Sequence, residues 1–243
     1  LDIAGIAREC HTAGVPLAVD NAHGAYLRFL PKGGAEQRDF SAFPLHPTEA
    51  GADICCDSAH KTLPVLTGGA YLHISRNAPK GMTKKAKAAF SVFGSSSPSY
   101  LILQSLDAFN ASAEKFCAEL AGFLQQAAGL KAKLTLHGFN VFESEPLKLT
   151  LRPKPFGYTG ADLAHMLEND GVFSEFFDDD FIVFMLSPLL PAVHFKRLSN
   201  ALLNIPKKPK IVSEPPKIAS AESAQFPPSA ALPQFLRSCR VRL

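Results

Sequence analysis

The sequence predicts an α/β fold: a three-layer α/β/α arrangement around a mostly parallel sheet, followed by a small α+β domain. Three observations predict it. A helical pattern is followed by short apolar runs without polar alternation, which are typical of strands covered on both faces. A long helical pattern comes next, and shorter segments of alternating polarity follow it. The chain of 243 residues, 47% of them hydrophobic, is long enough for one large domain or two smaller ones.

We expect the large domain over residues 1–130. It begins with a helix over residues 2–13, which Gly14 ends because glycine is common just after a helix. Residues 30–50 are rich in proline, glycine and polar residues and predict a long loop. Three strands and one long helix complete the domain; they are expected at Val15–Asp20, Ala52–Cys56, Gly69–Ile74 and Pro98 to about Leu130, with Gly129 near the helix end.

Residues 131–205 predict the small α+β domain. Its helices are expected from the capping residue Thr159 to Asn169, with Gly171 after it, and over Pro191–Leu203. Its strands are expected over three segments, Lys133–His137, Leu147–Leu151 and Phe181–Leu186. Residues 206–243 form a proline-rich tail with seven Lys or Arg and two Glu. We expect this tail to be extended and solvated, with a site for phosphate or an acidic partner as the alternative.

Charge and cysteine content exclude several classes of protein. The net charge of +3 is too small to indicate nucleic-acid binding. No apolar run reaches the ~18 residues that a membrane span needs, so we expect a soluble protein. The five cysteines form neither a disulfide framework nor a zinc-ligand spacing, which indicates a reducing, cytoplasmic setting and no metal site. The start at Leu1, without Met or signal peptide, suggests that the chain begins partway through a longer protein.

A cluster of reactive side chains follows the second predicted strand. Ser58, His60 and Lys61 lie within four residues, at a strand end, where open α/β folds place their ligand sites. The hydroxyl and the imidazole can hold an anion, and a desolvated lysine becomes an amine nucleophile. Taken alone, the same residues also fit a polar surface turn.

A carboxylate ends the first predicted strand. Asp20 directly follows mostly apolar residues, and burying it there is costly unless a cation meets it. It could instead cap a turn, and the nearby His23 could be a structural histidine. A strand-end Asp, followed about forty residues later by Ser-x-His-Lys, suits pyridoxal phosphate. Asp20 would hold the pyridinium nitrogen protonated, and Lys61 would form an imine with the aldehyde.

These two motifs, with the run Leu66–His73, closely resemble the major domain of the Orn/Lys/Arg decarboxylase family. Its members are fold-type I pyridoxal-phosphate enzymes, and the resemblance covers about residues 1–205. The resemblance implies that Lys61 is the Schiff-base lysine and that Asp20 pairs with the pyridine nitrogen. It also implies that His23 lies near the phenolic oxygen of the ring, and that the phosphate ligands are Ser58 and His60.

The segment Gly94–Tyr100 resembles a family segment that reaches the phosphate of the neighbouring subunit. This implies that Ser96 binds cofactor in a homodimer with a shared active site. The alternative is that the serines cap the long helix that follows. In the family, the first part of the large domain, with a phosphate loop and a ring-stacking side chain, precedes the position of Leu1.

The activity that the resemblance implies is decarboxylation of a basic amino acid, of the lysine, arginine or ornithine type. The alternatives are another fold-type I reaction, by an aminotransferase or lyase, or an inactive fragment that lacks half of the cofactor site. Pro64 and Gly68-Gly69 depart from the family pattern, which affects the substrate more than the cofactor. An acidic cluster is the candidate pocket for a basic side chain, or else a solvated turn; it comprises Glu175, Asp178, Asp179 and Asp180.

Overall fold

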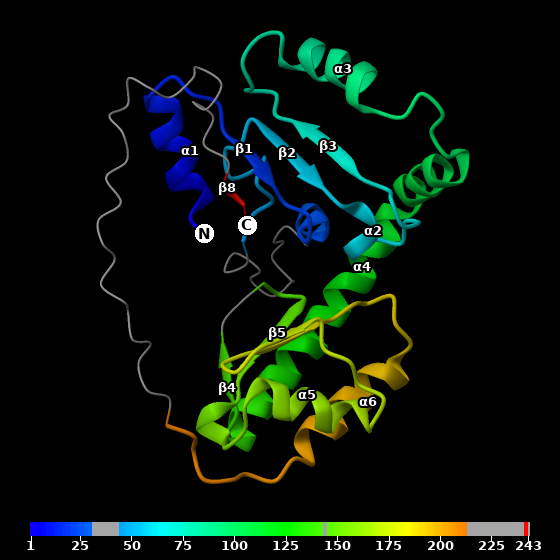
Figure 1. The fold of residues 1–243 in the computed structure, drawn as a ribbon. Helices are drawn as coiled ribbons and strands as arrows, with labels where there is room; N and C mark the ends of the chain where they lie inside the picture. Colours follow the sequence, from blue (N-terminus) through cyan, green and yellow to red (C-terminus); the bar gives the residue numbers. More distant parts are fainter. Residues whose placement is uncertain (31–43, 143–144, 213–240, 243) are drawn as a thin grey trace. The chain divides into compact units, whose positions relative to one another are not determined.

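The computed structural model describes residues 1–30, 44–142, 145–212 and 241–242 (Figure 1). They divide into two compact units, one of residues 1–116 with the strand at 241–242, the other of residues 117–212. The division falls inside the long helix, and the domain boundary predicted at residue 130 stays a prediction. Most of the predicted loop over 30–50 and of the tail over 206–243 lies outside the described residues.

The sheet of the first unit is mostly parallel, as predicted. Its strand order is β3-β2-β1-β8. Strand β1 (Ala18–Asp20) is parallel to both β2 (Ile54–Asp57) and β8 (Val241–Arg242), whereas β3 (Tyr71–Ile74) is antiparallel to β2. The expectation that β1 is buried on both faces is wrong, because only its middle residue, Val19, is buried. Ala18 and Asp20, which share the other face of the strand, are exposed.

Helix α1 (Ile3–Thr12) begins and ends as predicted. Asp2 caps it by accepting the backbone N–H of Gly5 at 2.8 Å, and Gly14 follows with φ +69°. Its apolar face packs with the first strand in a small core; the members are Ile3, Ile6, Ala7, Cys10, Leu17, Val19 and Ala52. The short helices η1 (Ala25–Phe29) and α2 (Ala59–Thr62) follow β1 and β2.

Helix α4 (Tyr100–His137) is longer than predicted. The strand predicted over Lys133–His137 is wrong, because these residues form the last turns of α4. Leu130 and Leu134, one helical turn apart, are both buried, so the short alternation belonged to a helix face. Gly129 does not end the helix; Gly138, with φ +109°, does.

The second unit also contains an antiparallel sheet of order β4-β5-β7-β6. The predicted strands at 147–151 and 181–186 and both predicted helices are confirmed. Thr159 and Asp162 form a capping box at the start of the first helix. The elements are β4 (Asn140–Phe142), β5 (Lys148–Arg152), η2 (Lys154–Phe156), α5 (Gly160–Glu168), β6 (Phe176–Phe177), β7 (Ile182–Met185) and α6 (Ala192–Leu203).

The first unit contains one further helix, α3 (Met82–Phe93), which the sequence analysis did not predict and none of whose residues is buried. Among all helices in the described ranges, none is both long and apolar enough to cross a membrane.

Candidate active site

The two predicted motifs lie at the carboxyl ends of neighbouring parallel strands (Figure 1). Asp20 is the last residue of β1 and pairs in register with Cys56 of β2. Just beyond β2, Ser58 is the N-cap residue of α2, which carries His60 and Lys61. The fold therefore brings both motifs to the carboxyl ends of adjacent strands, where open α/β folds place ligand sites.

The carboxylate of Asp20 and the amine of Lys61 are both exposed. Asp20 Oδ1 accepts the backbone N–H of Ala22 at 3.2 Å, so this carboxylate also caps the turn after β1. Within the described ranges, Lys61 has no ion pair and no side-chain hydrogen bond. His23 is half-buried in the turn between β1 and η1. A carboxylate and a primary amine are thus accessible to a ligand at the carboxyl ends of β1 and β2.

His60 is held by the carbonyl oxygen of Gly69. Its backbone N–H donates to that oxygen at 3.2 Å, and its Nδ1 lies 2.9 Å from the same atom. A carbonyl only accepts, so Nδ1 carries the proton. Nε2 can then donate to an anion only when the ring is an imidazolium. The neighbouring Ser58 makes no side-chain capping bond, which leaves its hydroxyl for a ligand.

Ser96 lies between α3 and α4 and is exposed. Helix α4 begins at Tyr100, and the backbone N–H of Leu103 donates to the Ser99 carbonyl at 3.1 Å. Ser96 is therefore not the residue that caps the helix. In the part of the chain that the structure describes, no hydrogen bond or ion pair joins Ser96 to the other predicted site residues.

A buried polar cluster that the sequence analysis did not single out is centred on Asp57, the residue just before Ser58. Asp57, the last residue of β2, is 2% exposed. Its Oδ2 lies 3.0 Å from His46 Nε2 and 2.8 Å from His73 Nε2, and its Oδ1 accepts Asn21 Nδ2 at 2.8 Å. We call these four residues the Asp57 cluster. The available signal was that Asp57, like Asp20, directly follows an apolar run.

Asp57 is ionised in this cluster. Burial raises its pKa, but the hydrogen bond from His46, the close approach of His73 and the bond from Asn21 lower the pKa by more. On the far side of His46, Nδ1 accepts the hydroxyl of Thr48 at 2.8 Å and its backbone N–H at 3.4 Å. The Nε2 proton of His46 therefore points to Asp57.

The same cluster offers three atoms of metal-ligating type, from His46, Asp57 and His73, within 4.8 Å of one another. Two atoms bound to a tetrahedral zinc at ~2.0–2.1 Å would lie ~3.3 Å apart. The observed contacts of 3.0 and 2.8 Å are instead typical of direct hydrogen bonds and ion pairs. The geometry is that of an ionised carboxylate approached by two histidine rings.

Two adjacent thiols flank the cluster in β2. Burial, followed by the charge of Asp57, raises the pKa of Cys55. Burial, followed by the charges of Asp20 and Asp57, raises the pKa of Cys56. Both thiols stay protonated near neutral pH, so neither is a reactive thiolate there.

The acidic cluster of the second unit is a solvated turn. Lys154 Nζ lies 2.8 Å from Asp180 Oδ1, and this hydrogen bond raises the pKa of Lys154. Asp178 Oδ1 accepts the backbone N–H groups of Asp180 and Phe181 at 2.8 and 2.7 Å. These carboxylates stabilise the turn between β6 and β7.

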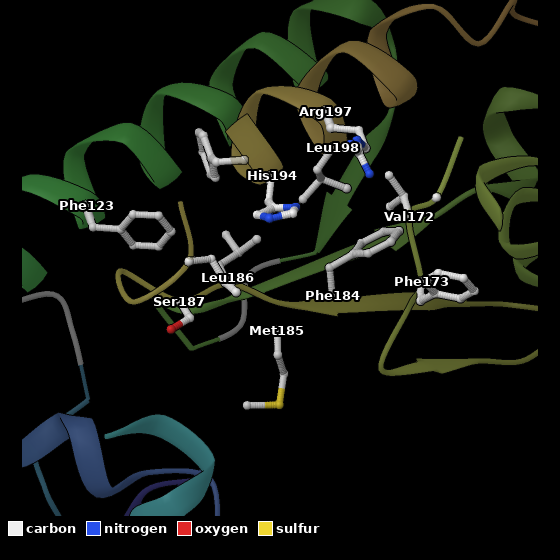
Figure 2. A pocket seen from close by; sticks show the side chains of 13 residues that line it. Phe123, Val172, Phe173, Phe184, Met185, Leu186, Ser187, His194, Arg197 and Leu198 are labelled. Atoms are coloured by element: carbon white, nitrogen blue, oxygen red, sulfur yellow. The ribbon is translucent and has the colours of Figure 1, made fainter. Parts of the chain in front are cut away.

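The second unit also contains an apolar pocket of about 240 Å³. Figure 2 shows that His194 and Leu198 on α6 face Phe184 and Leu186 across it. None of its lining residues is an acid or a lysine, and none is a predicted site residue. It therefore lacks the carboxylate and amine that the strand ends offer.

Comparison with known proteins places these motifs in a family. The family model "Orn/Lys/Arg decarboxylase, major domain" matches residues 1–145. The uncharacterized protein YaaO of Bacillus subtilis is 33% identical over 195 residues, which is 76% of this chain and 38% of the relative. An arginine decarboxylase of Halalkalibacterium halodurans is 30% identical over 170 residues, 65% of this chain and 32% of the relative. The chain thus spans about a third of the length of these relatives.

The fold is shared with solved structures. The constitutive lysine decarboxylase of E. coli superimposes with a TM-score of 0.61 at 17% identity, over 83% of this chain and 34% of the other. At this identity the likeness concerns the fold alone. It confirms the predicted fold-type I α/β architecture.

Proposed function

Because this chain belongs to the Orn/Lys/Arg decarboxylase family, we propose that it is part of a pyridoxal-phosphate-dependent carboxy-lyase acting on a basic amino acid. The observation that carries this proposal is the placement of Asp20 and the Lys61 motif at the ends of adjacent parallel strands. The names of the matching relatives, arginine and lysine decarboxylase, support arginine, lysine or ornithine as the substrate class.

The side chains at the strand ends fit pyridoxal phosphate. The cofactor needs a primary amine for its aldehyde, a carboxylate for its ring nitrogen and donors for its phosphate, and when bound it supplies an electron sink for decarboxylation. Lys61 and Asp20 are exposed there, and the Ser58 hydroxyl is not used as a helix cap. These residues therefore supply an amine, a carboxylate and a hydroxyl of the kinds that the cofactor needs.

Each residue has a distinct proposed role. Lys61 holds the cofactor covalently through Nζ, and Asp20 keeps the proton on the ring nitrogen. His23 lies near the phenolic oxygen. Either Lys61, once it is a free amine, or His23 delivers the proton to the α-carbon of the substrate.

Ser58 and His60 bind the phosphate in this proposal. Nδ1 of His60 already donates to the Gly69 carbonyl, so Nε2 is the ring nitrogen left to face the phosphate. The Ser58 hydroxyl makes no capping bond and can donate beside it.

We further propose a homodimer with a shared active site, in which Ser96 reaches the phosphate of the partner subunit. The support is an apolar surface on both sides of Ser96 in the chain. Phe90, Phe93, Tyr100 and Leu101 are 57%, 88%, 84% and 67% exposed. Contiguous exposed apolar surface marks interaction sites, and in this proposal a second copy of the chain covers these four side chains.

We also propose a cytoplasmic location. Three cysteines in the described ranges, Cys10, Cys55 and Cys56, are free thiols. Free thiols are typical of a reducing compartment.

Chemical trapping tests the proposal. The protein is incubated with pyridoxal phosphate and reduced with borohydride, and the modified peptide is identified by mass spectrometry. We expect the adduct on Lys61, and its loss in Lys61→Arg. The exposed Lys84 of α3 provides the matched control, because Lys84→Arg should keep the adduct. A protein that takes up no pyridoxal phosphate would contradict the proposal.

A product assay then separates decarboxylation from its alternatives. Arginine, lysine and ornithine are supplied in turn, and released CO₂ and the matching amine are measured. We expect both in equal amounts. A keto acid without CO₂ would instead support the aminotransferase alternative.

A further inference from the structure

We propose that Asp57 is a positioning residue for this reaction, because its cluster fixes the segment that carries Asp20 against the segment that carries Lys61. This inference rests on the proposed function. Asp57 does not need to touch the substrate or the cofactor for this role. It acts through Asn21 on one side and through the chain toward Lys61 on the other.

Asn21 is tied to β2 by two hydrogen bonds. Its backbone N–H donates to the Cys56 carbonyl at 2.9 Å, and its side-chain amide donates to Asp57 Oδ1 at 2.8 Å. Asn21 directly follows Asp20 in the chain. Any shift of the Asp57 carboxylate is therefore passed to the position of Asp20.

The turn after Asn21 is equally tight. The backbone N–H of Gly24 donates to the Asn21 carbonyl at 2.9 Å. A Cβ at Gly24 would lie 2.0 Å from Asn21 Oδ1, so only glycine lets the turn close over this side chain. The turn carries His23, which is thereby also held by the bond between Asn21 and Asp57.

The histidines fix the other oxygen of Asp57. His46 is fully buried and comes from the loop before β2, whereas His73 comes from β3. Both ring Nε2 atoms approach Oδ2, so the carboxylate cannot rotate without losing a buried contact. A buried charge without such partners is strongly destabilising. Three segments thus converge on one carboxylate, four residues before Lys61 in the chain.

Replacing Asp57 distinguishes positioning from simple stability. Asp57→Asn can still accept from Asn21 through Oδ1, but its amide NH2 replaces the oxygen that the rings of His46 and His73 approach. The segment that carries Asp20 is then held less firmly against the segment that carries Lys61. We therefore expect an absorbance titration with pyridoxal phosphate to show weaker binding, and kcat to fall ~10–100-fold with KM for the amino acid nearly unchanged.

Asp53 provides the matched control. It is 3% exposed and precedes the other end of β2. Its Oδ2 accepts the backbone N–H of Leu17 at 2.8 Å and lies 2.8 Å from His11 Nε2. Asp53→Asn makes the same chemical change to a buried carboxylate paired with a histidine. We expect it to lower the melting temperature but to leave kcat and the absorbance titration unchanged.

A second variant covers the case in which Asp57→Asn does not fold. Asn21→Ala keeps Asp57 and its two histidine contacts but removes the side-chain hydrogen bond to Asp57. We expect a similar fall in kcat and similarly weakened binding in the absorbance titration.

The outcomes separate this inference from the proposed function. The inference alone would be overturned by the following result. The wild-type protein forms the Lys61 adduct and releases CO₂, and the Asp57→Asn variant binds pyridoxal phosphate and turns over equally well. Equal losses of kcat in the Asp57 and Asp53 variants would also overturn it, because they indicate a purely structural effect. A wild-type protein without the adduct would overturn both proposals.

Discussion

Replacing Gly24 by alanine tests how tightly the turn after β1 is packed. The new Cβ would lie 2.0 Å from Asn21 Oδ1, 2.5 Å from Cγ and 2.6 Å from Nδ2. Carbon atoms do not approach other heavy atoms so closely, so the side chain of Asn21 must move. Its 2.8 Å hydrogen bond to Asp57 is then lost.

The size of the effect follows from burial. Asn21 is 7% exposed and Asp57 is 2% exposed, so water cannot replace the lost partner. A hydrogen bond to a charged group is worth ~1.5–3 kcal/mol, and we expect the free energy of unfolding to fall by about that amount. With an m value of ~2 kcal/mol/M, the urea midpoint should fall by ~0.8–1.5 M.

Urea unfolding followed by far-ultraviolet circular dichroism measures this shift. Gly122→Ala is the matched control, because nothing lies within 4 Å of a Cβ at Gly122 in α4. Alanine is the better helix former, so this control should raise the free energy of unfolding by ~0.5–1 kcal/mol.

Gly24→Ala made in the Asn21→Ala background tests whether the Asn21 side chain causes the cost. Alanine at position 21 lacks the three atoms that a Cβ at Gly24 would meet. We therefore expect Gly24→Ala to cost less than ~1 kcal/mol there, since neighbouring substitutions are not additive. The same full cost in both backgrounds would refute the steric argument.

Four further predictions concern stability and thiol chemistry. Thr159→Ala removes the capping box of α5 and should cost ~1 kcal/mol in urea unfolding. Leu149 in β5 is 0% exposed, and Leu149→Ala should cost ~2–5 kcal/mol in the same assay, where a cost below 1 kcal/mol would contradict its core position. Burial and then Asp20 raise the pKa of Cys56, so Asp20→Asn should speed its labelling by a thiol reagent at neutral pH; an unchanged rate would argue against their proximity. Because the pKa of Asp57 is lowered in the folded state, the unfolded state binds more protons in acid. The stabilisation of the fold by the ionised Asp57 carboxylate is therefore present above the unfolded pKa of ~3.9 and is lost as the pH falls below it. Acid titration of the melting temperature should therefore be less steep in Asp57→Asn, and an equal slope would contradict this assignment.

The sequence predicts the elements that carry the motifs because each contains a local signal. Asp20 and Lys61 follow apolar runs, and Thr159 begins a capping pattern that the structure confirms. The segment Lys133–His137 was misassigned because five alternating residues fit a strand as well as a helix face. Helix α3 was missed although Met82, Ala86 and Phe90 recur at helical spacing.

The Asp57 cluster could not be predicted, for a different reason. Its contacts join a loop, two strand ends and the interior of β3. The pairing of His46 and His73 with one carboxylate is set by the antiparallel packing of β3 on β2 and by the loop before β2. The positions of His46 and His73 in the sequence do not indicate that both contact Asp57, so the cluster is visible only in the folded chain.

The hydrogen bond between His60 and Gly69 has a thermodynamic consequence for the proposed cofactor site. One ring nitrogen is already bonded to a backbone carbonyl, so the orientation of the ring is fixed before the cofactor arrives. Less side-chain entropy is then lost on binding than a freely rotating histidine would lose.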